Sequence, residues 1–144
     1  MSRILHPTDF SPASRAAFAK ALQLAKKNRS ELVIAHVLAP VVPAVDGYVS
    51  PQVYDQMEAA GRRYGKKHLD ALVARARKAG VRARGLLLDG LVHERIVRAA
   101  RQQGAEMIVI GTHGRTGLAR FVLGSVASRV VSHAACPVLT VRGR

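Results

Sequence analysis

Short apolar runs alternate with longer stretches of helical spacing along the whole chain. Five runs, at residues 3–6, 32–38, 81–88, 107–110 and 137–141, predict strands. Most are continuously apolar rather than alternating, which is typical of a sheet covered on both faces. Pro137 at the start of the last run suits an edge strand, because proline cannot donate to a neighbour.

The segments between the runs predict helices. The first follows Ser11-Pro12, a good N-cap and first-turn pair, and ends near Asn28. The others cover about 52–79, 92–103 and 126–131. In the long second helix, we expect an inward face made of Tyr54, Met57, Leu69, Leu72, Val73 and Ala76. Gly61 and Gly65 weaken the middle of that helix.

Strands that alternate with helices predict one α/β domain over residues 1–144, with a parallel sheet and right-handed crossovers. Ligands of such sheets bind beyond the carboxyl ends of the strands. The turns at Asp9, after Val37, at Asp89-Gly90 and at Gly111 all lie at that edge.

The glycine-rich stretch 111–125 is the strongest candidate for chemistry. It joins a strand to a helix, and Gly111 and Gly114 leave room for a ligand near the backbone and permit positive φ. Gly124-Ser125 precedes the helix, whose free N–H groups attract anions, and Arg115 adds a charge. The pattern indicates a phosphate cradle; a plain loop with turn glycines and a serine N-cap is the alternative. It matches neither a Walker A loop nor the Rossmann fingerprint.

The spacing of this stretch is Gly, two residues, Gly, nine residues, Gly-Ser, and it resembles the nucleotide loop of ATP-binding members of the universal stress protein family. The resemblance extends to residues 4–9 and 136–141 and so covers nearly the whole chain. It implies a Rossmann-like, adenine nucleotide α-hydrolase-like fold with strand order 3-2-1-4-5. It also implies ATP and Mg²⁺ as ligands.

Carried over residue by residue, the resemblance implies a nucleotide site made of Pro7, Thr8, Asp9, Val37, Gly90, Gly111, Gly114, Arg115, Gly124, Ser125 and Val126. Asp9 would coordinate Mg²⁺ or accept a ribose hydroxyl; a carboxylate favoured by a helix N-terminus is the plainer interpretation. The proline often found two positions after the glycine at 90 is absent here, which weakens the assignment of that turn.

The net charge of +14 suggests a polyanion partner. However, the basic residues are spread along the chain over predicted helix surfaces, and the few aromatic residues are scattered. We therefore favour a solvated cationic surface over specific nucleic-acid binding.

No apolar run reaches the length of a membrane span and no signal peptide is evident, so we expect a cytoplasmic protein without membrane contact. The single cysteine, Cys136, is interpreted as a small hydrophobic residue.

The function predicted from the sequence is that of a nucleotide-responsive module in stress response, in which ATP orders the loop 111–124 and changes the surface offered to a partner. The six histidines show no metal-binding spacing and no side chain stands out as a catalytic base, so an enzyme is the less favoured alternative. That enzyme would be a slow ATPase or a nucleotide transferase.

We also expect a homodimer that pairs through residues 137–142, because an apolar edge strand left open would promote aggregation.

Overall fold

The computed structural model describes residues 1–41, 47, 49–113 and 123–143. In chain order, the elements are β1 (Arg3–Pro7), α1 (Pro12–Asn28), β2 (Glu31–Leu38), α2 (Pro51–Lys78), β3 (Ala83–Asp89), α3 (Val92–Gln102), β4 (Met107–Gly111), α4 (Ser125–His133) and β5 (Val138–Val141). Every predicted strand and helix is present. The third strand starts two residues later than predicted, because the Val81 amide still donates to the carbonyl of Ala76 at the end of α2.

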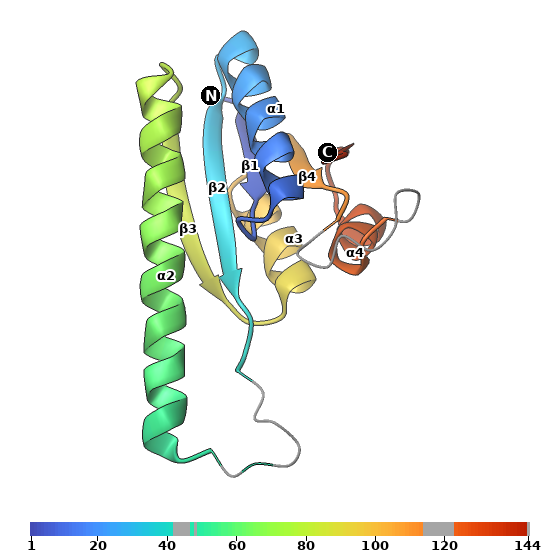
Figure 1. Ribbon diagram of the computed structural model, residues 1–144. Helices are drawn as coiled ribbons and strands as arrows, with labels where there is room; N and C mark the ends of the chain where they lie inside the picture. Colours follow the sequence, from blue (N-terminus) through green and yellow to red (C-terminus); the bar gives the residue numbers. More distant parts are fainter. Residues whose placement is uncertain (42–46, 48, 114–122, 144) are drawn as a thin grey trace.

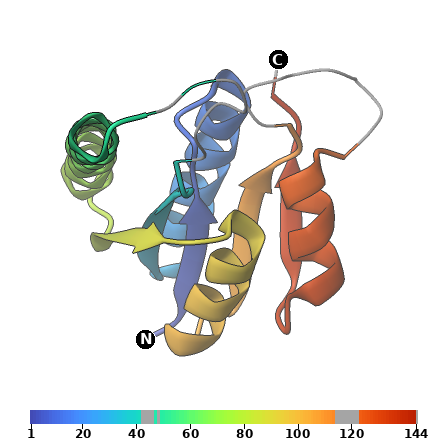
Figure 2. The same cartoon turned by 90° about the horizontal axis from the view of Figure 1, so that it is seen from below.

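The five strands form one parallel sheet in the predicted order β3-β2-β1-β4-β5. Figure 2 shows α1 and α2 on one face and α3 and α4 on the other. Two apolar clusters fill the two interlayer spaces. Phe18, Ile34 and Leu69 lie in the first, and Leu5, Ile96 and Ile108 in the second. Because both faces are covered, the central strands are buried on both sides, as their continuous apolar runs predicted.

Helix α1 begins where the sequence predicted. The Ser11 hydroxyl oxygen accepts a hydrogen bond from the Ser14 amide at 3.3 Å, and Pro12 occupies the first turn. At the other end, Arg29 adopts a left-handed conformation with φ of 55°. The stripe of small residues that includes Ala17, Ala21 and Ala25 is buried, which lets the helix approach the sheet closely.

The inward face predicted for α2 is correct only in its second half. Leu69, Val73 and Ala76 are buried, whereas Met57 is 50% exposed, so its predicted burial is wrong. Figure 1 shows the reason: the first half of α2 extends past the end of the sheet, so that among the described residues no strand lies against it. Helical spacing places a residue on the inward face of a helix, but the residue is buried only where another element lies opposite it.

Gly65 lies on the buried face of α2, against β2 and β3. A Cβ atom built there would come within 2.9 Å of the His36 ring and 3.3 Å of the Leu87 side chain. The His36 ring is held in place, because its Nδ1 donates to the Thr8 carbonyl at 2.8 Å. Glycine is therefore needed at this position for packing, while a Cβ at Gly61 would meet nothing within 4 Å.

Within the described ranges, no helix is both long and apolar enough to cross a membrane.

Candidate functional site

A cavity of about 250 Å³ opens at the carboxyl ends of β1 and β4. These neighbouring strands lie where the chain changes direction across the sheet, since β2 and β3 are on one side and β5 is on the other. This is the switch point at which open α/β sheets bind ligands. The cavity is lined by Pro7, Thr8, Asp9, Ser14, Ala35, His36, Val37, Val92, Ile96, Ile110, Gly111, Thr112, His113, Gly124, Ser125, Val126 and Ala127.

The turn from β1 to α1 forms one wall and is held by its own side chains. The Thr8 hydroxyl oxygen accepts hydrogen bonds from the Ser14 hydroxyl at 2.6 Å and from the Phe10 amide at 3.0 Å. The Asp9 carboxylate accepts one from the Ser11 amide at 2.9 Å. These bonds stabilise the positive φ of 64° at Phe10 and keep the Asp9 carboxylate at the cavity.

The start of α4 forms the opposite wall. The Gly124 amide donates to the Thr112 carbonyl at 2.6 Å, so the chain returns to the end of β4 just before the helix begins. Gly124 is the N-cap and has no side chain, and α4 has no side-chain cap bond. The first turn of α4 lines the cavity through Ser125, Val126 and Ala127. Its N–H groups and the positive end of the helix dipole therefore favour an anion there.

The cavity combines this anion-binding end with an apolar part. Val37, Ile96 and Ile110 line it together with Ala35 and Val92. A ligand with a flat apolar ring at one end and a negative charge at the other would match both parts.

Most of the predicted site residues come together at this cavity. Pro7, Thr8, Asp9, Val37, Gly111, Gly124, Ser125 and Val126 all line it. Gly90 does not: it directly follows β3 with φ of 129°, and its amide donates to the Leu38 carbonyl. Gly114 and Arg115 lie outside the described residues.

Gly111 lines the cavity, and a second contact also requires glycine there. Its freedom to adopt a positive φ is not used, since among the described glycines the positive φ values belong to Gly80, Gly90 and Gly104. A Cβ at Gly111 would lie 3.0 Å from the backbone oxygen of Ala13. Glycine at this position lets the start of α1 pack against the end of β4.

Several residues that line the cavity are not predicted from the sequence. Ser14 and Thr112 contribute hydroxyl groups, and His36 reaches the cavity from β2. The sequence held one signal for Ser14, which is three residues after the N-cap and so on the first turn of α1. His36 is buried within β2, and from the sequence alone the burial of a strand residue does not reveal which cavity the strand borders.

Comparison with known proteins shows which family the chain belongs to. The model of the universal stress protein family matches residues 1–142. The chain belongs to this family. Among other members, it is 35% identical over 140 residues to the universal stress protein MJ0531 of Methanocaldococcus jannaschii, which covers 97% of this chain and 81% of that protein. It is 32% identical to YxiE of Bacillus subtilis, covering 98% of this chain and 99% of YxiE.

Solved structures of universal stress proteins share the fold. A family member from Burkholderia pseudomallei has a TM-score of 0.78 at 35% identity, covering 96% of this chain and 94% of that one. A universal stress protein from Archaeoglobus fulgidus, solved in complex with dAMP, has a TM-score of 0.69 at 26% identity and covers 98% of both chains. An Arabidopsis thaliana family protein solved with AMP bound has a TM-score of 0.73 at 19% identity, covering all of this chain and 93% of that one, and it supports the fold alone.

Proposed function

We propose that this universal stress protein binds ATP in the cavity between β1 and β4 and acts as a nucleotide-responsive module. The observation that carries the proposal is the combination, in one cavity, of an apolar part and the N-terminus of α4 without a side-chain cap. The apolar part suits adenine, and the N-terminus of α4 suits phosphate. The relative from Archaeoglobus fulgidus with dAMP supports an adenine nucleotide as the ligand.

In this proposal, the adenine lies against Val37 and its apolar neighbours, and the phosphates lie at Gly124, Ser125 and Val126. Arg115 and Gly114 complete the phosphate loop. Asp9, with its carboxylate at the cavity, holds Mg²⁺ together with phosphate oxygens and water. Among the residues that the structure describes, no group of three His, Cys, Asp or Glu side chains could hold a metal on its own. The magnesium therefore arrives with the nucleotide.

The proposed role is a change of surface rather than turnover. ATP orders the loop between Gly111 and Gly124, and a partner protein recognises the ordered form. A slow ATPase is the alternative, since a carboxylate and a hydroxyl-rich turn border the same cavity. Steady release of phosphate by the purified protein, lost in Asp9→Ala, would favour the enzyme.

The proposal is tested by Gly124→Val. The backbone of Gly124 has φ of −57° and ψ of 157°, which valine adopts without strain, so the variant should fold normally. Because Gly124 lines the cavity, we expect the valine side chain to reduce the space for phosphate and ATP affinity measured by calorimetry to fall by at least tenfold, about 1.4 kcal/mol. The matched control is Ser128→Val, which lies on the exposed side of the same helix and should bind as the wild type does. Unchanged affinity in a folded Gly124→Val variant would reject the cavity as the nucleotide site.

The magnesium assignment is tested by Asp9→Asn. We expect chelation of magnesium to weaken ATP binding to the wild type and to have little effect on the variant, because the variant has lost the carboxylate that favours the metal. An equal response to the chelator in both proteins would show that Asp9 does not contact the metal.

A further inference from the structure

The edge of the sheet opposite the cavity gathers positive charge. In a parallel sheet with helical crossovers, the strands start and the preceding helices end at this same amino-terminal edge. In Figure 1 it is uppermost, where the N-terminus and the ends of α1 and α2 lie. The last turn of α1 carries Lys26 and Lys27, and that of α2 carries Arg77 and Lys78, all of them exposed.

The strands add cations to those of the helices. Arg3 begins β1, Arg82 directly precedes β3, and Arg84 is the second residue of β3. The end of α3 contributes Arg101. Residues far apart in the sequence are therefore brought to one edge by the topology. The preference of helix C-termini for cations accounts for some of these residues, but not for Arg3, Arg82 and Arg84 at the starts of β1 and β3.

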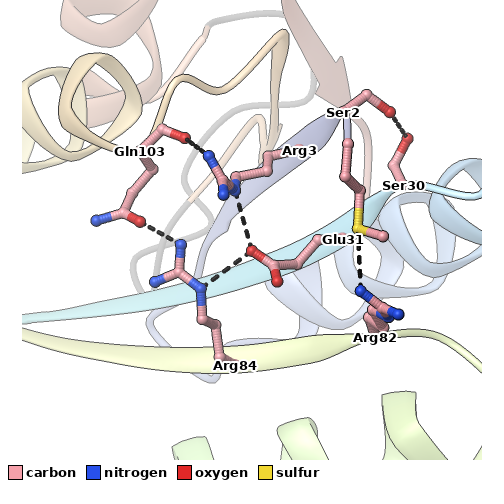
Figure 3. A network of polar contacts seen from close by, with 8 residues as sticks. Ser2, Arg3, Ser30, Glu31, Arg82, Arg84 and Gln103 are labelled. Atoms are coloured by element: carbon pink, nitrogen blue, oxygen red, sulfur yellow. Dashed lines mark hydrogen bonds and ion pairs between the residues drawn. The ribbon is translucent and has the colours of Figure 1, made fainter.

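The carboxylate nearest these arginines is already engaged by them. Glu31 Oε1 accepts hydrogen bonds from Arg3 Nε at 3.1 Å and from Arg84 Nε at 3.0 Å, as Figure 3 shows. Partial burial acts to raise the pKa of Glu31, but the bonds and charges of Arg84 and Arg3 outweigh it and lower the pKa overall. Glu31 therefore stays ionised and orders the two arginines, leaving one net positive charge in the trio.

Gln103 anchors the same arginines from the end of α3. Its backbone carbonyl accepts a hydrogen bond from Arg3 Nη1 at 3.0 Å, and its side-chain oxygen accepts one from Arg84 Nη2. The network thus joins the starts of β1, β2 and β3 to the end of α3 (Figure 3). The network fixes the guanidinium groups of Arg3 and Arg84, so binding an anion to these two arginines costs little side-chain entropy.

We propose that this basic edge, defined by Arg3, Lys27, Lys78, Arg82, Arg84 and Arg101, binds the phosphate backbone of a nucleic acid duplex. Most of these residues are arginines, whose planar guanidinium groups match phosphate oxygens. The strand arginines lie at the starts of β1 and β3, two strands apart, which spans roughly 10 Å at about 4.8 Å per strand, and the ends of α1, α2 and α3 extend this edge to both faces of the sheet.

The aromatic residues favour a duplex over a single strand. Single strands are bound largely by stacking of bases on aromatic rings. Among the aromatic residues that the structure describes, Phe18 is buried, while Phe10, Tyr54 and Tyr64 lie toward the other end of the molecule. The basic edge therefore contacts backbone without reading bases, which predicts sequence-independent and salt-sensitive binding.

The proposal is independent of the nucleotide site, because the two sites lie at opposite edges of the sheet. We test it with Lys27→Gln, Lys78→Gln and Arg101→Gln combined, a triple variant of exposed residues from three helices. The probe is a fluorescent DNA duplex of about 20 base pairs, titrated by anisotropy over a series of salt concentrations. Wild type should bind with a dissociation constant in the micromolar range near physiological salt. In the variant, the slope of log affinity against log salt should flatten by about 2–3, since each phosphate contact contributes about 0.9.

The matched control removes three charges elsewhere: Arg15→Gln, Arg63→Gln and Lys67→Gln, all exposed and outside the basic edge. It should retain the wild-type salt slope. Flattening to the same extent in both triple variants would show diffuse attraction and overturn the proposal. So would equal or tighter binding of wild type to polyglutamate or to anionic vesicles at the same salt. ATP binding by both variants, expected at wild-type strength, reports that the fold and the nucleotide site are intact.

Discussion

At the scale of single residues, His6 shows how burial changes chemistry. The ring is fully buried at the end of β1, and its Nδ1 donates to the Val109 carbonyl at 2.9 Å. Burial disfavours the charged ring more than the Val109 bond and the nearby Asp9 carboxylate favour it, which lowers the pKa of His6 to about 4. The ring is therefore neutral at physiological pH and serves as a link between neighbouring strands.

This shift predicts a loss of stability in mild acid. The unfolded chain binds a proton at His6 near pH 6.5, while the folded chain resists it down to about 4. The stabilisation from His6 is complete above pH 6.5 and is lost as pH falls toward 4, by up to about 1.4 kcal/mol per pH unit. Urea unfolding of His6→Asn should show a weaker dependence on pH over this window than wild type. His133→Asn, at an exposed position, is the control, and a slope in His6→Asn equal to that of wild type would contradict the assignment.

At the scale of elements, the two halves of α2 have different surroundings. Its second half packs on β2 and β3, and its first half extends beyond the sheet (Figure 1). Both glycines of the helix lower its intrinsic propensity, yet only one of them faces a neighbour. The sequence signal at Gly61 and Gly65 is the same, and the packing around them differs.

We therefore expect opposite effects from the same substitution four residues apart. Gly61→Ala should raise the free energy of unfolding by about 0.5–1 kcal/mol, through helix propensity in open space. Gly65→Ala should lower it by about 1–3 kcal/mol, because the methyl group meets the His36 ring and Leu87. Each variant is the control for the other in urea denaturation. If both are stabilised, the packing described between α2 and β2 is incorrect.

At the scale of the whole molecule, β5 is one of the two edge strands of the sheet, and β3 is the other. Along β5, successive residues direct their backbone groups alternately toward β4 and away from it. On the β4 side, the Pro137 and Val141 carbonyls accept hydrogen bonds from the amides of Ile108 and Thr112. By the alternation of a parallel strand, Leu139 also faces β4, while Val138 and Thr140 direct their backbone groups to the open edge. Antiparallel pairing of two copies about a two-fold axis would satisfy those groups.

The homodimer is thus tested best at position 140. Thr140→Pro removes an outward N–H and should give monomers in sedimentation experiments, while Thr140→Val keeps the N–H and should remain dimeric. Proline at Leu139 would instead break the pairing with β4, so that dissociation of the dimer could not be distinguished from unfolding. Sedimentation of the unmodified protein as a monomer at micromolar concentration would reject this interface.

The sequence alone determined the order and kind of the elements and the edge at which the strand-end turns meet. Those properties follow from periodicity and capping, which are local: Ser11-Pro12 starts α1 whatever lies around it. Strand order came from the family resemblance, and the structure has the same order. The spacing of the glycine-rich stretch predicted a phosphate cradle, and of its predicted residues Gly111, Gly124 and Ser125 line the cavity, while Gly114 and Arg115 lie outside the described residues.

Only the tertiary structure decided properties that depend on what lies opposite a residue. Met57 and Leu69 share helical spacing, but only Leu69 lies against the sheet. Gly111 accommodates the Ala13 backbone, a contact between segments about a hundred residues apart. The basic residues are far apart in the sequence, whereas the parallel topology brings many of them to the amino-terminal edge of the sheet. Local chemistry sets each segment, whereas burial and charge density depend on which segments the fold brings together.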